Sequence, residues 1–223
     1  MKLATAFLSA VVLLHSASAH YIWTTLVTDS TSTTAAVRQP VNNSPVTDVT
    51  SKDITCNINN GPGSETVEVA AGSEITFLLD NTLYHEGPAA IYLGQVPAGS
   101  TAATWDGSGA NWFKIAEWSA TFNPFGFTDF NLSQLGAKIP ASVPSGEWDL
   151  YPFSPFQYLA RIEQIGLHVA GAPQWYISCA QIKVTGGGSA NPSRVSIPGY
   201  VSPNGTCEAC SSVFQLQRIA PTF

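Results

Sequence analysis

The chain has 223 residues, of which only 11% are charged, and its formal net charge is −6 at pH 7. Its 9 Lys and Arg residues form no basic patch that could bind a phosphate backbone, so we expect no nucleic-acid partner. Crossing a bilayer takes about 20 consecutive apolar residues, and no segment of this chain reaches that length. We therefore expect no membrane partner either.

The first nineteen residues predict an export signal. Lys2 supplies the positive end, Ala6 to Leu14 the apolar run, and Ala17-Ser18-Ala19 the small-residue cleavage site. Cleavage there would make His20 the first residue of a secreted, extracellular protein. The remaining chain, residues 20–223, has a length typical of one domain, and we expect a monomer.

Short segments alternate apolar and polar residues with period 2, notably 67–69, 75–79 and 177–184, and turn residues separate them. No segment has a long helical apolar stripe, and the nearest to a helix is Trp112 to Trp118. The pattern predicts an all-β fold, an immunoglobulin-like or fibronectin-like antiparallel β-sandwich with decorating loops and short helices. From about residue 200 the composition changes, which predicts an atypical C-terminal segment that wraps the sandwich as loop.

The four cysteines favour disulfides, because an exported chain with an even number of cysteines usually oxidises them. We predict one bridge between Cys56 and Cys179 and a local one between Cys207 and Cys210. A zinc site at the second pair is the alternative, but structural zinc needs four ligands and this pair has no neighbouring ligand residues. Three sequons agree with the secretory route: Asn42, Asn131 and Asn204.

The expected mature chain has three histidines, His20, His85 and His168, and the first of them is its first residue. An N-terminal histidine offers its α-amine and its ring Nδ1 to one metal ion in a six-membered chelate. A second imidazole opposite, for which His85 is the candidate, completes a tetragonal nitrogen site of the kind that copper(II) favours. Alternatively, His20 could be first by chance and His85 an ordinary histidine of a surface loop.

Five segments carry a resemblance to a known family. They are His85-Glu86-Gly87-Pro88, Trp112 to Ile115, Arg161 to His168, Gln174 to Gln181, and Thr185 to Ser189. In this order the chain resembles auxiliary activity family 9, the fungal lytic polysaccharide monooxygenases formerly classed as glycoside hydrolase family 61. The resemblance runs from His20 to about Pro198.

The resemblance implies that His20 and His85 bind copper and that Tyr176 lies at the axial position. His168 and Gln174 would lie beside the metal, where they can hold a proton or orient an oxygen-containing co-substrate. Residues two apart on a strand share a face, so Gln174 and Tyr176 can both point at the site. By the same alternation, Glu163 lies on the opposite face from His168, and we assign it a structural role.

The implied function is oxidative cleavage of β-1,4-glucan, cellulose first and hemicellulose second, by hydroxylation at C1 and/or C4. It requires one copper ion, O2 or H2O2 as co-substrate, and an external reductant or redox partner protein. One alternative is a hydrolytic endoglucanase, which would need two carboxyl groups that flank the bond. The other is a non-catalytic secreted protein that binds copper or the cell wall.

Three departures from the family pattern affect the choice of substrate. The spacing from His168 to Gln174 and that from His20 to His85 are both short. The segment from Cys207 to Phe223 lacks the usual substrate-face aromatic residue, and Phe214 is the nearest substitute. Tyr21 and Trp23 could stack on sugar rings, although a buried position is at least as compatible with their alternation.

Overall fold

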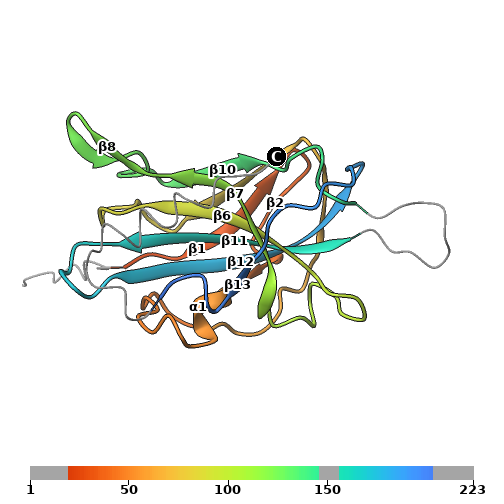
Figure 1. Ribbon diagram of the computed structural model, residues 1–223, viewed down its shortest axis with the longest axis horizontal. Helices are drawn as coiled ribbons and strands as arrows, with labels where there is room; N and C mark the ends of the chain where they lie inside the picture. Colours follow the sequence, from red (N-terminus) through yellow and green to blue (C-terminus); the bar gives the residue numbers. More distant parts are fainter. Residues whose placement is uncertain (1–19, 146–155, 203–223) are drawn as a thin grey trace, which may run out of the picture.

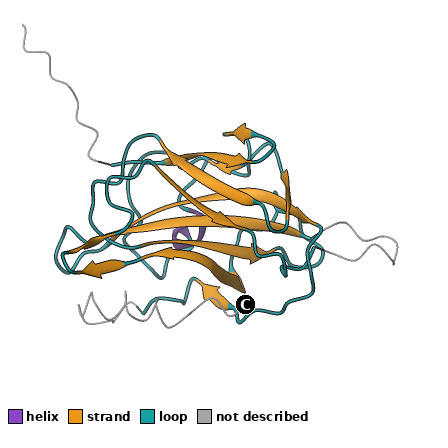
Figure 2. Ribbon diagram, turned by 90° about the horizontal axis from the view of Figure 1, so that it is seen from above, coloured by secondary structure: helices purple, strands orange, loops and turns teal. Residues whose placement is uncertain are grey.

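The computed structural model describes residues 20–145 and 156–202, and strands make up nearly all of the regular structure there (Figures 1 and 2). Several predictions fall outside the described residues: the export signal, the Cys207–Cys210 pair, the sequon at Asn204 and the aromatic residue Phe214.

The smaller sheet has four strands, and its order is β10 (Gln134–Lys138), β5 (Glu74–Leu79), β1 (Trp23–Thr28) and β2 (Ser32–Thr33). The larger sheet has the order β13 (Val195–Ile197), β7 (Gly109–Trp118), β6 (Ala89–Gln95), β11 (Gln157–Gly166), β12 (Gln174–Thr185) and β3 (Val37–Arg38), and β4 (Val67–Ala70) also pairs with β12. A separate hairpin joins β8 (Ala120–Phe122) to β9 (Phe125–Phe127), and the short helix is α1 (Asp53–Cys56). The predicted antiparallel β-sandwich is confirmed.

The main core lies between the two sheets. Trp23 and Leu26 of β1 and Phe77 of β5 are fully buried there against Ile162 and Ala180 of the larger sheet. Phe77, Ile162 and Ala180 follow the period-2 alternation of their strands, because every second side chain of a strand points to the same face. Trp23 and Leu26 are three residues apart, and both are buried because a register shift interrupts β1 between Trp23 and Thr25. The sandwich therefore gains its apolar burial in the way that the sequence pattern predicts.

A second core covers the opposite face of the larger sheet. Helix α1, the loop before it and residues 195–201 pack there around Trp112, Tyr92 and Ile177. The disulfide predicted between Cys56 and Cys179 is present and joins α1 to β12. Because the larger sheet is covered on both sides, β11 and β12 are buried along almost their whole length.

The segment from Trp112 to Trp118 is strand β7, so its interpretation as the nearest approach to a helix was wrong. Trp112 packs into the outer core and Phe113 into the inner one, which produces adjacent buried aromatic residues without a helix. The β4 and β12 strands pair in parallel, an exception to the predicted antiparallel arrangement.

Among the described residues, no helix is long and apolar enough to cross a membrane.

Candidate metal centre

Three of the predicted site residues come together at one end of the sandwich. The ring centroids of His20 and His85 lie 6.1 Å apart, and Tyr176 lies 5.9 Å from the first and 5.6 Å from the second. His20 and His85 are partly exposed, whereas Tyr176 is buried in the main core. The cluster therefore has a solvent-facing side formed by the histidines and a buried side formed by the tyrosine.

Backbone contacts with the end of β11 place His85. The Leu167 N–H donates to the carbonyl of Glu86 at 2.8 Å, and the Ile165 N–H donates to that of Pro88 at 2.9 Å. Gly87 lies between these contacts, where a Cβ atom would overlap the carbonyl oxygen of Ile165. The glycine of His85-Glu86-Gly87-Pro88 is thus required by the close approach of two backbones.

A buried glutamine, Gln164, also fixes the segment that carries His85, and sequence reasoning missed this residue. Gln164 donates from Nε2 to the carbonyl of His85 at 3.0 Å, and its Oε1 accepts from the Tyr21 hydroxyl at 2.6 Å. Gln164 is fully buried and lies directly across from Tyr176 in the strand register. The available signal was its parity in β11, since residue 164 shares the inward face with Ile162.

Tyr21 and Trp23 are buried and form no outer surface for sugar rings. Tyr21 packs against Tyr176 with ring centroids 4.3 Å apart, and Trp23 donates from its indole N–H to the Tyr176 carbonyl at 3.3 Å. Burial raises the pKa of Tyr21 and of Tyr176 above the usual range, so both phenols stay protonated. The floor of the site is aromatic and neutral.

His168 and Gln174 flank the cluster. The exposed His168 ring stacks on His85, with centroids 3.6 Å apart and planes 10° from parallel. Gln174 accepts from the Tyr176 hydroxyl at 2.7 Å, as expected for residues two apart on one strand face. On the other face of β11, Glu163 forms an ion pair with Arg161 at 2.7 Å, in keeping with the structural role assigned to it.

The donor set fits a copper ion. A metal held about 2 Å from one nitrogen of each imidazole allows ring centroids at most about 6.5 Å apart, and those of His20 and His85 meet this condition. Within the described residues, no group of three or more His, Cys, Asp or Glu side chains could hold a metal. The two histidines can offer two imidazole nitrogens, and a chain processed to begin at His20 would add its α-amine as a third nitrogen donor.

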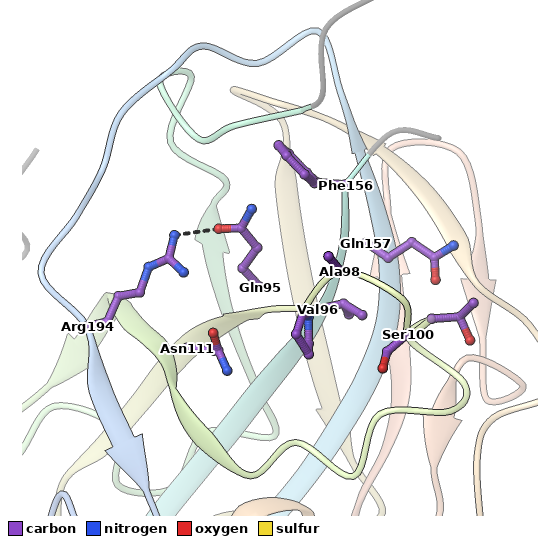
Figure 3. A pocket seen from close by; sticks show the side chains of 10 residues that line it. Gln95, Val96, Ala98, Ser100, Asn111, Phe156, Gln157 and Arg194 are labelled. Carbon is purple, nitrogen blue, oxygen red and sulfur yellow. Dashed lines mark hydrogen bonds between the residues drawn. The ribbon is translucent and has the colours of Figure 1, made fainter. Parts of the chain in front are cut away.

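The protein also has a pocket of about 560 Å³, which Figure 3 shows from close by. Gln95, Phe156 and Arg194 line it, and Arg194 donates a hydrogen bond to Gln95. Gln95 ends β6, whereas His85 precedes the first residue of that strand, so the pocket and the histidine cluster lie at opposite ends of the sheet. The pocket therefore takes no part in the candidate centre.

The fold and this cluster define a class of protein: an all-β sandwich with a candidate copper centre whose first ligand is the histidine that would begin the processed chain. The sequence model of "Auxiliary Activity family 9 (formerly GH61)" matches residues 20–212. The chain belongs to this family, whose known activity is copper-dependent oxidative cleavage of polysaccharides.

Individual relatives agree. The chain is 46% identical to AA9 family lytic polysaccharide monooxygenase H of Malbranchea cinnamomea, over 84% of this chain and 82% of that protein. It is also 46% identical to AA9 family lytic polysaccharide monooxygenase E of Podospora anserina, over 82% of this chain and 60% of that protein. A cellulose-active polysaccharide monooxygenase from M. thermophila has a similar structure, with 28% identity, a TM-score of 0.69 and coverage of 83% of this chain and 88% of that chain. The predicted class of enzyme, a copper-dependent oxidoreductase, is confirmed over the hydrolytic and non-catalytic alternatives.

Proposed function

We propose that the mature enzyme starts at His20, is secreted as a monomer, and oxidises β-1,4-glucan chains at a single copper ion held by His20 and His85. The cluster of His20, His85 and Tyr176, with ring centroids within 6.1 Å of one another, carries this proposal. The family model begins to match at residue 20, which supports removal of the preceding segment.

Bound copper would supply the one-electron chemistry that hydroxylation at C1 or C4 of the sugar requires, with O2 or H2O2 as co-substrate and an external electron donor. His20 contributes its amine and ring nitrogen, and His85 contributes an imidazole nitrogen. Tyr176 limits access from the buried side, and its hydroxyl is held by Gln174. The exposed His168, stacked on His85, can hold or deliver a proton at its imidazole nitrogen.

Cellulose is the first substrate to test, with hemicellulose second. One structural relative with 28% identity is described as cellulose-active. The histidine side of the cluster is partly exposed at the end of the sandwich, an arrangement that can meet a polymer chain at a surface.

Mass spectrometry of the secreted protein together with its copper content tests the proposal most directly. We expect a first residue of His20 and one copper ion per chain. His20→Ala should lower copper affinity by more than the about 10- to 100-fold that loss of an outer partner of a metal ligand costs. Copper affinity should also fall with decreasing pH, because protons compete with the metal for the amine and imidazole nitrogens.

The products test the reaction. Aldonic acids or C4-oxidised sugars should form from cellulose only with reductant and copper. Plain reducing sugars formed without reductant, or full activity in a protein that keeps residues before His20, would refute the proposal.

A further inference from the structure

The β8–β9 hairpin presents aromatic side chains to solvent. Phe122 and Phe125 are 67% and 65% exposed, and their ring centroids lie 6.2 Å apart. Phe127 meets the edge of Phe125 at 5.7 Å. Large apolar side chains that expose this much surface side by side mark binding surfaces.

Both legs of this hairpin attach to the segment that carries His85. In the first leg, Trp118 lies opposite Ala89 in the register of β7 and β6. In the second leg, the Asn131 N–H donates to the Leu83 carbonyl at 2.7 Å, and Leu83 donates back to Leu132 at 2.9 Å. Leu83 and Ala89 bracket His85 along the chain, so the base of the hairpin adjoins the candidate copper centre.

The hairpin reaches outward from this base. Figure 1 shows β8 beyond the two sheets, at the end of the molecule where β11 and β12 are joined. The strands pair along their full length, with Ala120 opposite Phe127 and Phe122 opposite Phe125. The Thr121 hydroxyl also donates to the Pro124 carbonyl at 3.1 Å across the turn. The two phenylalanines are therefore presented on a paired strand rather than on a loose loop.

The chemistry of the hairpin selects a neutral partner with flat apolar faces. Residues 120–127 contain no charged side chain, and only Thr121 and Asn123 are polar. A β-linked glucose unit has axial C–H faces that can pack on an aromatic ring, and equatorial hydroxyls that an amide or a hydroxyl can bond. The chain as a whole carries a net charge of −6, which disfavours anionic lipid surfaces.

We propose that Phe122 and Phe125 form a polysaccharide-contacting arm that holds an insoluble β-glucan surface beside the copper centre. The proposal rests on the proposed function and adds to it a substrate contact outside the residues matched to the family's site. The arm enlarges the area that can face an extended polymer, in a chain whose spacing between His20 and His85 is short.

Binding measured without reductant tests the arm directly. The variant Phe122→Ala/Phe125→Ala should bind suspended microcrystalline cellulose at least fivefold more weakly in depletion isotherms. Phe156→Ala is the matched control, because Phe156 is 39% exposed but lies at the pocket on the opposite end of the sheet (Figure 3). Copper affinity and thermal midpoint should stay unchanged in both variants, which excludes misfolding and damage to the centre.

The outcomes separate the two proposals. Isotherms of the double variant that coincide with those of the wild type would overturn the arm, even if the wild type oxidises cellulose. Absence of oxidised sugars from the wild type would overturn the proposed function, while the isotherms would still decide on the arm. The arm is also overturned if the double variant abolishes dimerisation, or binding to phosphatidylcholine vesicles, while it retains full affinity for cellulose.

Discussion

Two buried carboxyl groups of this protein lie in opposite electrical surroundings. Glu163, on the outer face of the larger sheet, is fully buried with its Oε2 2.7 Å from the Arg161 guanidinium and 2.5 Å from the Tyr200 hydroxyl that donates to it. Asp129, in the turn after β9, is 1% exposed, and neither of its carboxyl oxygens has a hydrogen-bond partner among the described residues. The first carboxylate is compensated and the second is not.

The difference shows how the two sides of the molecule are stabilised. Behind the larger sheet, Arg161 also donates to the carbonyls of Ile54 and Thr55, so the ion pair fastens α1 and the segment of Tyr200 to the sheet. Burial alone would lower the pKa of Arg161, but Glu163 raises it above its ordinary value. On this side of the molecule, the buried charges of Arg161 and Glu163 therefore hold the packed segments together.

Next to the candidate copper centre, burial favours neutral groups instead. Burial raises the pKa of Asp129 to about 7. Its own backbone N–H lowers this pKa, but by less than burial raises it. Asp129 is close enough to Tyr21 to raise the pKa of that phenol as well. Below neutral pH this end therefore buries neutral Asp129, Tyr21, Gln164 and Tyr176, which suits a metal held by neutral nitrogen donors.

The largest expected effect concerns the compensated carboxylate. Glu163→Gln leaves the buried Arg161 cation without its counter-charge, and we expect the free energy of unfolding to fall by about 3–5 kcal/mol. Denaturant unfolding measures this loss, and the copper affinity of folded protein should not change. Glu68→Gln is the control, because Glu68 pairs with Lys183 at the surface and should cost less than about 1 kcal/mol. Equal losses in the two variants would contradict a structural role for the buried pair.

Removing the uncompensated charge of Asp129 should raise the free energy of unfolding, in contrast to the loss expected for Glu163→Gln. The size of this gain should depend on pH. The folded state of the wild type holds the Asp129 proton up to about pH 7, whereas the unfolded chain releases it near 3.8, the ordinary pKa of an aspartate side chain. Stability of the wild type should therefore fall as the pH rises through this window and level off above it. Asp129→Asn removes this term, so its stability relative to the wild type should rise by up to about 4 kcal/mol between pH 4 and pH 8.

Urea unfolding at pH 4, 6 and 8 checks this expectation. Asp29→Asn provides the control, since Asp29 is exposed and the same substitution there should leave the pH profile of stability unchanged. A constant difference between Asp129→Asn and the wild type at all three pH values would show that Asp129 titrates like an exposed carboxyl group.

The alternation of apolar and polar residues along each strand predicted the side-chain directions of several residues at the two carboxyl groups and the metal end. It placed Glu163 on the face opposite His168, put Gln174 and Tyr176 on one face, and was enough to predict the all-β class. It failed at Trp112 to Trp118, because three successive residues of β7, Trp112 to Lys114, are buried on both faces and hide the alternation there.

Two features of the metal end depend on contacts between distant segments. Gln164 accepts a hydrogen bond from Tyr21, a residue 143 positions earlier that lies beside it only in the folded protein. The β8–β9 hairpin acquires its role only through the pairing of its base with Leu83 and Ala89. Neither partner is encoded in local periodicity, so a single sequence offered no direct signal for them.

The smallest expected effect is that of Gln164→Leu on copper affinity. It tests whether Gln164 positions the metal ligand His85 or only stabilises the fold. Gln164→Leu removes both the acceptor of the Tyr21 hydroxyl and the donor to the His85 carbonyl. The segment that presents the His85 ring should loosen, and copper affinity should fall about tenfold, the lower end of the effect of outer partners of metal ligands. Calorimetric titration of the metal-free protein with copper measures the affinity, and electron paramagnetic resonance should show altered copper(II) parameters.

Gln181→Leu is the matched control for this change. Gln181 is an equally buried glutamine in β12 that donates to the carbonyls of Gly63 and Glu65 and so holds a loop on the same sheet. Both substitutions leave buried polar groups unpaired and should cost about 1–3 kcal/mol of stability. Only Gln164→Leu should alter copper binding, because only Gln164 contacts the segment of a predicted ligand. An equal loss of copper affinity in the two variants would assign the effect to general loosening of the sandwich, and the neutral network at the metal end would then have no specific part in positioning His85.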